Sequence, residues 1–432
     1  MEHEEPEAEL ERLTEERNKV SQSIGQAKRE GRDFSEHIAR HKELSARIAA
    51  LEEQLSPQTD EESEPSVKVL SAWEDVEAIA NEYKDLIERS SVASPFLLPE
   101  WLFGCYRHFA VGTHQPRFVT VRDETGKLMG AAPLMLGIEK WRLWRQRVLR
   151  FIGTGPGLHA YYLAFPVDLD HPEAMGMLVD QVAELAADDA VVILDHVSPF
   201  ADGQAMRAHL LASAGRDWLM LQEEAAYYGP LGSSMEEFIS LVPQLRRRNR
   251  IRQGDRRLRE VFTSVEHRTP ANAEEVLAGV SELISMSMRR HRAKGSDSTL
   301  SGEQEGAFLR EAFDKLHAAG MLRLIELVCD GQVCATTAAL VYRGNCYSYQ
   351  VCIEPRFADY HPGHHVMVEL IRRSIDEGLE TFNFLTGSGQ YKAEYFPRRT
   401  PPFSLIGLPP KGRARSTELL KRLLQSLRGR RG

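Results

Sequence analysis

Three strand-like runs in the second half of the chain are separated by two-residue turns, and this spacing constrains the fold more than any other feature of the sequence. The runs are Leu322–Cys329, Val333–Tyr342 and Asn345–Ile353, and the turns are Asp330-Gly331 and Arg343-Gly344. Connections this short between strands are typical of tight antiparallel hairpins. The sequence therefore predicts a three-stranded meander over residues 322–353.

Helical and strand patterns surround this meander. Ala273–Arg292 and Glu303–Ala319 predict two helices before it, His365–Glu377 predicts one after it, and Thr381–Leu385 predicts a further strand. This order of elements indicates a mixed sheet with helices on both faces, which is an α/β fold.

The first half shows a similar order more faintly. It predicts, in sequence, a helix, a strand hairpin, a second helix and a buried strand, over Trp73–Ser90, Arg117–Val121 with Leu128–Leu136, Pro172–Ala187 and Val191–Leu194. The repeated order favours an internal structural duplication, so we expect two tandem α/β units.

Length and composition bound the class of protein. A chain of 432 residues predicts two or three domains, and 42% apolar with 27% charged residues is typical of a soluble globular protein. The net charge of −9 excludes a generic polyanion binder, so any nucleic-acid surface must be local. We expect no signal peptide and no membrane span, because the acidic N-terminus lacks an apolar core and no apolar run reaches about 18 residues. The cysteine pattern predicts buried free thiols in a reducing cytoplasm, since the count is odd and no Cys-x-x-Cys pair occurs among Cys105, Cys329, Cys334, Cys346 and Cys352.

The first 56 residues predict an antiparallel pair of helices. Apolar residues fall on an a/d seam in both helices: Leu10, Leu13, Val20, Ile24 and Ala27, then Phe34, Ile38, Leu44, Ile48, Leu51 and Leu55. Gly31 can adopt a left-handed C-cap and Asp33 can cap the next helix. Basic residues cover the remaining faces: Arg12, Arg17, Lys19, Lys28, Arg29, Arg32, Arg40, Lys42 and Arg47. On this pattern alone, the hairpin is either a dimerising coiled coil with solvated charges or a polyanion-binding arm.

The predicted boundaries follow from these patterns. Residues 57–66 are polar, acidic and rich in proline and serine, which indicates a linker. We expect a helical hairpin arm over 1–56, a first unit over 67–240, a second unit over 241–408 and a basic amphipathic tail over 409–432.

The arm carries a motif of a known family. It reads Glu16-Arg17-Asn18-Lys19-Val20-Ser21, then Ile24-Gly25, then Lys28 to Asp33, and it resembles the N-terminal hairpin of seryl-tRNA synthetases. The resemblance implies tRNA binding through Arg17, Lys28, Arg29 and Arg32. The synthetase's catalytic motifs do not follow, so the arm is expected to serve another enzyme.

A second motif lies in the second unit. Residues 349–363, YQVCIEPRFADYHPG, precede a predicted helix, and residues 383–392, NFLTGSGQYK, follow it. This pattern resembles GNAT-fold proteins of the cellulose-biosynthesis acetyltransferase and Fem-type aminoacyltransferase group, over about residues 67–408. The resemblance implies two tandem GNAT units and transfer of an acyl group to an amine. Three positions depart from the family pattern: His361 replaces a serine, and Asn383 and Ser388 replace aspartates.

The motif supplies the candidate site residues. Transfer by direct attack of an amine needs positioning, proton removal and oxyanion stabilisation, but no covalent nucleophile and no metal or redox cofactor. We therefore consider Lys392, Tyr391, His361 and Asn383 as catalytic candidates. The donor-binding candidates are Tyr349, Pro362, Gly363 and Gly387, since the helix amides after Pro362-Gly363 can hold a phosphate or carboxylate. The alternatives are that Tyr391 and Tyr349 belong to the core and that Lys392 is solvent-exposed. The histidines near Gly363 lack a carboxylate or cysteine at ligand spacing, so we predict no metal site.

Two stretches are strongly basic. One holds eight arginines within residues 246–259, and the other is the tail, where basic residues accompany an apolar stripe. Each is compatible with a solvated helix face, with phosphate or RNA contact, or with a membrane surface.

These observations predict an N-acyltransferase that forms an amide on a small amine, peptide or amino-sugar acceptor. The expected donor is an aminoacyl-tRNA, with seryl-tRNA as the first candidate. One alternative is acyl-CoA-dependent transfer, with the coiled coil forming a homodimer. Another is a catalytically silent RNA-binding or scaffold protein, which Asn383 and Ser388 would favour.

Overall fold

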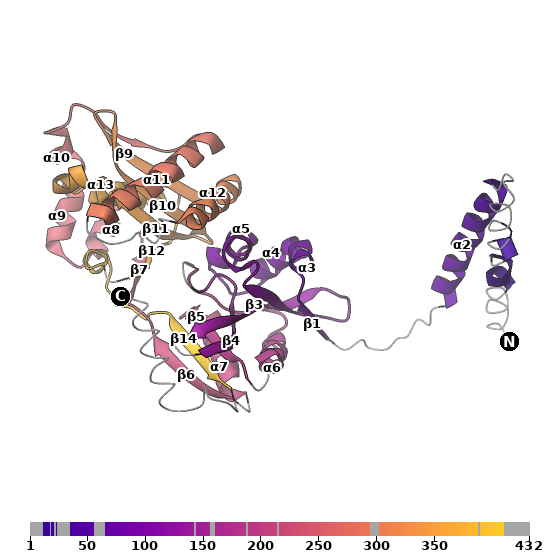
Figure 1. The fold of residues 1–432 in the computed structure, drawn as a ribbon. Helices are drawn as coiled ribbons and strands as arrows, with labels where there is room; N and C mark the ends of the chain where they lie inside the picture. Colours follow the sequence, from indigo (N-terminus) through magenta and orange to yellow (C-terminus); the bar gives the residue numbers. More distant parts are fainter. Residues whose placement is uncertain are drawn as a thin grey trace. The chain divides into compact units, whose positions relative to one another are not determined.

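The computed structural model describes residues 12–17, 19–20, 23, 35–55, 65–141, 144–155, 160–186, 189–213, 216–293, 302–387 and 389–409. The chain divides into two compact units, Met1–Glu64 and Pro65–Gly432. Figure 1 shows the elements of each unit.

The arm is helical where it is described. Residues 12–17 and 19–20 are helical, and α2 covers Ser35–Leu55. Leu13, Leu44 and Ile48 are buried together with Val20 against them, which confirms these positions of the predicted seam. Arg40 pairs with Glu16 across the two helical segments, with 2.8 Å between the guanidinium and carboxylate. Burial of a narrow apolar seam, supported by this ion pair, therefore holds the hairpin together.

Within its described residues, the compact unit Pro65–Gly432, which includes both predicted α/β units, contains two seven-stranded mixed sheets. The first has the strand order β1 (Ser66–Leu70), β2 (His114–Arg122), β3 (Leu128–Trp141), β4 (Trp144–Phe151), β5 (Val191–Val197), β14 (Phe403–Leu408) and β6 (Asp217–Gln222). The second has the order β13 (Arg398–Arg399), β7 (Ala226–Pro230), β12 (Thr381–Thr386), β11 (Asn345–Ile353), β10 (Gln332–Tyr342), β9 (Leu322–Cys329) and β8 (Val265–Arg268).

Helices pack against both sheets. Those of the first half are α3 (Trp73–Ala78), α4 (Ala80–Arg89), α5 (Pro99–Cys105), α6 (Ala174–Ala186) and α7 (Ala201–Ala212). Those of the second half are α8 (Met235–Leu241), α9 (Leu245–Gln253), α10 (Arg256–Arg259), α11 (Ala273–Ala293), α12 (Glu303–Ala318), α13 (Pro362–Asp376) and α14 (Lys392–Tyr395). The helix predicted over 73–90 is interrupted at Ile79, whose ψ of 11° departs from helical geometry. The tandem α/β architecture expected from the sequence is thus observed.

The two halves exchange strands. β14, drawn in yellow in Figure 1, pairs with both β5 and β6 in the first sheet, although it comes from the end of the chain. In return, β7 pairs with β12 and β13 in the second sheet. The boundary expected at residues 240–241 therefore does not separate the sheets: β7 lies before it and belongs to the second sheet, while β14 lies after it and belongs to the first.

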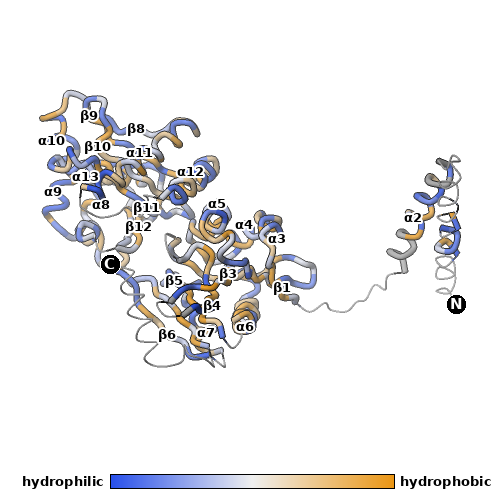
Figure 2. Tube along the Cα trace, in the orientation of Figure 1, coloured by the Kyte–Doolittle hydropathy of each residue, from blue (hydrophilic) through white to orange (hydrophobic). Residues whose placement is uncertain are grey.

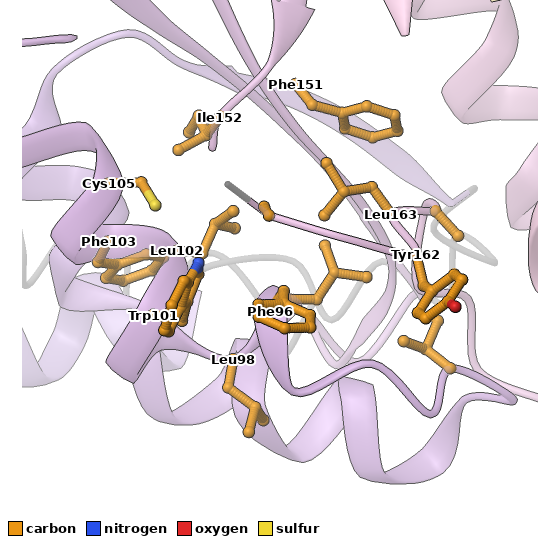
Figure 3. Packing of buried hydrophobic residues seen from close by; sticks show 14 of the residues in the cluster. Phe96, Leu98, Trp101, Leu102, Phe103, Cys105, Phe151, Ile152, Tyr162 and Leu163 are labelled. Carbon is orange, nitrogen blue, oxygen red and sulfur yellow. The ribbon is translucent and has the colours of Figure 1, made fainter. Parts of the chain in front are cut away.

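A continuous apolar core joins the halves. Figure 3 shows part of it around Trp101 and Phe96. Trp101 is fully buried and meets Phe308 of α12 and Tyr349 of β11 edge-on, with ring centroids 5.0 Å apart in both cases. Arg343, in the β10–β11 turn, donates hydrogen bonds to the carbonyls of Ile87, Glu88, Ser90 and Val92 and so satisfies the C-terminal end of α4. These contacts fix the halves against each other, and with them the region around β11 and β12.

Candidate active site

The parallel strands β11 and β12 separate after three residue pairs. They pair at Asn345–Thr381, Cys346–Phe382 and Tyr347–Asn383, and β11 then continues to Ile353 without β12 beside it. The register of β11 with β10 skips Tyr349, which is therefore the extra residue of a β-bulge. This divergence leaves backbone and side chains of the second half of β11 available to line a site.

A cavity of about 360 Å³ lies beside this part of β11. Its wall is made by residues of α9, α11, β11, the first turn of α13 and the segment around α14: Arg247, Arg250, Arg290, Val351, Ile353, Ala358, His361, Gly363, His364, Met367, Tyr391 and Tyr395. Three arginines and two tyrosines over an apolar floor suit a ligand that carries negative charge and an uncharged portion.

Arg247 is the buried cation of this wall. Its side chain is only 6% exposed, it pairs with Glu394, and its guanidinium lies over the Tyr395 ring at 4.7 Å. Arg247 also donates to His364 Nδ1 at 2.8 Å, while its buried Nε has no hydrogen-bond partner within the described chain. A buried arginine with one pairing carboxylate and a remaining donor can bind a further acceptor, such as a ligand oxygen.

His364 and His361 remain neutral at neutral pH for a physical reason. Burial and the nearby Arg247 charge lower the pKa of His364 to about 3, and its Nδ1 accepts hydrogen bonds from Arg247 and the Tyr395 hydroxyl. Burial and the Arg250 charge also lower the pKa of His361, which is more exposed and stands at the N-cap position of α13 without a side-chain hydrogen bond to the helix. His361 can therefore offer a lone pair to a proton at neutral pH, whereas His364 is held in a hydrogen-bond network.

The first turn of α13 lies close to β11. His361 adopts a left-handed conformation with φ 53°, and Pro362 begins the helix. A Cβ on Gly363 would lie 3.0 Å from Ile353 Cγ2, a tight contact, so glycine favours this close approach of helix to strand. The predicted residues His361 and Gly363 line the cavity, while Pro362 is buried next to them.

Asp255 connects the arginine-rich helices to α13. It lies between α9 and α10, and its two carboxylate oxygens contact His365 Nδ1 of α13 at 2.9 Å and His267 Nε2 of β8 at 2.8 Å. Burial alone would raise the pKa of Asp255, but the hydrogen bonds with His267 and His365 outweigh it and hold that pKa well below its ordinary value. The carboxylate thus remains charged and fixes α9 and α10 on the cavity side of α13.

Lys392 is engaged by backbone carbonyls. Its ammonium donates to Phe384 O at 2.9 Å and to Thr386 O at 2.7 Å, so it joins α14 to the end of β12. Burial lowers the pKa of Lys392 to about 8, although Glu224 acts in the opposite direction. Gly387 has a φ of 133°, and a Cβ there would lie 3.0 Å from the ammonium nitrogen. Neither Lys392 nor Gly387 belongs to the cavity wall, whereas Tyr391, which is 42% exposed, does.

Asn383 and Tyr349 occupy packed positions. The side-chain oxygen of Asn383 accepts from the Tyr162 hydroxyl at 3.1 Å and from Leu385 N at 2.8 Å, and Asn383 is only 4% exposed. Tyr349 packs against Trp101 and Phe313, in agreement with the core alternative. The departure from the family's aspartate at position 383 therefore lies in the packing of β12 against the first half, outside the cavity wall.

Sequence reasoning missed part of the wall. Arg247 was noted only as one of the arginines of 246–259 and His364 only as one of the histidines near Gly363, and Tyr395 was not considered. Arg247 and Ile251 lie four residues apart on the buried face of α9, which is the signal that could have found Arg247. Of the predicted tRNA-binding residues, Arg17 lies on the first helix of the arm and is partly exposed. Lys28, Arg29, Arg32, Ser388 and the tail lie outside the described residues.

Two features are absent from the described ranges. These ranges contain no group of three histidine, cysteine, aspartate or glutamate side chains placed to hold a metal ion. They also contain no helix that combines the length and hydropathy needed to cross a membrane.

Two family models and several solved structures are similar to parts or most of this chain. Residues 246–393 match the acetyltransferase (GNAT) domain family, and residues 1–67 match the seryl-tRNA synthetase N-terminal domain family. The crystal structure of FemX aligns with a TM-score of 0.55 at 14% identity, covering 76% of this chain and 95% of that chain. L-PGS from Bacillus licheniformis has a TM-score of 0.45 at 12% identity, covering 81% and 97% of the two chains. A tandem GNAT protein from the clavulanic acid biosynthesis pathway has a TM-score of 0.40 at 13% identity, covering 81% and 99%. No curated protein sequence matches the chain.

The domain match and the fold narrow the class of protein. Residues 246–393 carry an acetyltransferase (GNAT) domain match, and the fold is similar to that of FemX over 76% of the chain. The chain also carries an N-terminal domain of the seryl-tRNA synthetase type.

Proposed function

We propose that the protein transfers an aminoacyl group from an aminoacyl-tRNA, with seryl-tRNA as the first candidate, to the amine of a small molecule, peptide or amino sugar. The observation that carries the proposal is the joining in one chain of a GNAT-fold acyltransferase and a seryl-tRNA synthetase N-terminal domain. A tRNA-binding domain has a direct use in an acyltransferase whose donor is a charged tRNA.

The cavity beside β11 supports this donor. A terminal nucleotide brings a phosphate, which Arg247, Arg250 and Arg290 can bind, and a flat base, which Tyr391 can contact. The volume of about 360 Å³ suits the end of a nucleic-acid strand and excludes a folded domain.

The reaction needs only groups that the chain provides. The acceptor nitrogen attacks the ester carbonyl carbon, the new C–N bond forms, and the bond from that carbon to the ribose oxygen breaks. The proton lost by the amine ends on the released ribose hydroxyl. His361 is the candidate for carrying this proton, because it lies in the cavity wall and its lowered pKa keeps it neutral.

Acyl-CoA is the alternative donor, and the same arginines favour it because its pyrophosphate is also an anion. In that case the arm would serve dimerisation. The alternative of a catalytically silent scaffold was favoured by Asn383 and Ser388, which replace aspartates. Asn383 lies outside the cavity wall, so its replacement no longer supports this alternative.

The test offers both donors to the same preparation. The full chain is incubated with total tRNA charged with labelled amino acids, or with labelled acyl-CoAs, together with a panel of amines, peptides and amino sugars. The proposal expects label to move from tRNA to an acceptor as a hydrolysis-resistant amide, with serine preferred. Transfer from acyl-CoA alone would support the alternative, and transfer from neither donor would favour the scaffold.

A further inference from the structure

The arginine-rich segment over α9 and α10 presents charge that the protein itself does not neutralise. Arg246, Arg252 and Arg257 are exposed and have no ion-pair or hydrogen-bond partner within the described chain. Arg256 has only a fully solvated contact with Glu260, in which the two side chains are 82% and 60% exposed. Some other arginines of the second half are neutralised, as Arg323 is by Glu377 and Arg372 by Glu369. The segment 246–257 is distinguished by having several exposed, unneutralised arginines close together in the chain.

This concentration opposes helix stability. Arg246 and Arg250, and likewise Arg248 and Arg252, are four residues apart in α9, so their like charges face each other. A solvated helix face does not require pairs of like-charged arginines, because glutamate or glutamine at some of these positions would be solvated equally and would remove the repulsion. A polyanion bound along the helix would also remove the repulsion between the arginines.

The surface is also held in a fixed position. Asp255, between the two helices, contacts His365 of α13 and His267 of β8, and Ile251 and Leu258 are buried in the second core. The arginines are thus presented by a rigid support, which reduces the entropy lost when they bind.

The same helix leads into the cavity. Arg247 and Arg250 line the cavity wall, and Arg246 precedes them on α9. Figure 2 shows hydrophilic colouring along α9. We propose, resting on the proposed function, that Arg246, Arg252, Arg256 and Arg257 form a docking surface for the acceptor stem of the donor tRNA, whose 3′ end enters the cavity. A base-paired stem adjoins the 3′ end of tRNA, so its phosphates are the polyanion closest to that cavity.

An RNA surface fits these helices better than a membrane surface does. A membrane-binding helix buries an apolar face in the lipid. In α9 and α10, Leu245 is exposed, but Ile251 and Leu258 are buried within the protein and are not available to lipid.

The test uses the full chain with all four arginines changed to glutamine (R246Q, R252Q, R256Q and R257Q). None of these residues lines the cavity. The matched control removes the same charge from exposed residues elsewhere: K68Q, K140Q, R145Q and R310Q. Melting temperatures first establish that both variants fold. The probes are an RNA minihelix with the acceptor stem and 3′ end of seryl-tRNA, and a single-stranded oligonucleotide with the same 3′ end.

The first measurement is binding of the uncharged minihelix by fluorescence anisotropy at several salt concentrations. Each phosphate contact contributes about 0.9 to the slope of log affinity against log salt, so losing four should flatten the slope by roughly 3–4. Between 50 and 200 mM salt, this amounts to roughly a hundredfold less salt sensitivity. The control should match the wild type. Equal slopes for the variant and the control would overturn the proposal.

The second measurement is kcat/KM for transfer from both probes after aminoacylation. In the variant, kcat/KM for the minihelix should fall to the value for the single strand. For the single strand, the variant and the wild type should have equal kcat/KM. Transfer that is equal from both probes in the wild type would contradict the docking surface without affecting the proposed function. If the wild type transfers from neither probe while minihelix binding still depends on the four arginines, the proposed function fails and the RNA surface remains. Reduced binding of the variant to phosphatidylglycerol vesicles, with unchanged RNA binding, would assign the surface to membranes and overturn the proposal.

Discussion

Replacing Lys392 with methionine separates two roles that the residue can have. The sequence predicts a cation that stabilises an oxyanion or a donor phosphate, whereas the structure gives the ammonium two backbone carbonyls, Phe384 O and Thr386 O. Methionine retains most of the packing volume and removes the charge and the donors. The two carbonyls then lose their partner at the end of β12.

The expected loss of stability follows from these two contacts. A hydrogen bond to a charged group contributes about 1.5–3 kcal/mol, and partial solvent access at this site favours the lower end. For two such bonds at the lower end we therefore expect about 3–4 kcal/mol less stability. For a unit of about 370 residues, at ~2.1 cal/mol/K of unfolding entropy per residue, the melting temperature should fall by roughly 4–5 °C.

The assay combines calorimetry with single-turnover transfer at a temperature where both proteins are folded. A structural role predicts the lower melting temperature together with a rate loss below about tenfold. An unchanged melting temperature with a rate loss of roughly 10²–10³ would refute the structural reasoning, because that is the effect of removing one oxyanion contact. Lys392→Arg is the control, since it keeps the charge and the donors.

Four further outcomes are expected. A variant without residues 1–56 should bind tRNA at least about tenfold more weakly and with a shallower salt dependence; equal binding across salt concentrations would contradict a tRNA-binding arm. Asparagine tolerates the left-handed backbone at position 361, so His361→Asn should keep the fold. This variant should lower the transfer rate by about 10²-fold and remove the acidic limb of the pH–rate profile. In the wild type that limb should lie below pH ~6.5, because the pKa of His361 is lowered. Asp255→Asn should cost about 1.5–3 kcal/mol of unfolding free energy in urea at pH 7. The difference should narrow as the pH falls below ~4, because a carboxyl whose pKa is depressed on folding stabilises fully above its unfolded pKa and loses this stabilisation as the pH falls toward its folded pKa; identical curves at pH 7 would exclude this role. Chelators should leave transfer unaffected, and activity restored by zinc alone would contradict the metal-free mechanism.

The local features of the fold could be predicted from the sequence. The turns at Asp330-Gly331 and Arg343-Gly344 have positive φ at both residues, 47° and 77° in the first and 46° and 72° in the second, as two-residue hairpins require. Such turns are specified by adjacent residues, and so are the helices α11, α12 and α13 that flank the meander.

Long-range pairing could not be predicted in this way. β14 pairs with β5, about 210 residues earlier, and neither strand contains a local sign of its partner. The same limit applies to the site. His361, Gly363 and Tyr391 follow one another in a recognisable motif, whereas the role of Arg247 depends on which face of α9 is buried, and that is decided by packing against α13 and α14.

The exchange of β7 and β14 has a consequence for synthesis of the protein on the ribosome. When residues 65–222 have emerged, β5 and β6 are both present, but the strand that lies between them is still about 180 residues from being translated. The nascent first half therefore exposes two unpaired strand edges, which are sites for aggregation. The second half cannot complete its own sheet without β7, which lies between β12 and β13 and is translated early. The two GNAT units are thus obligate partners in folding, and neither would be recovered intact by expressing a simple half of the gene.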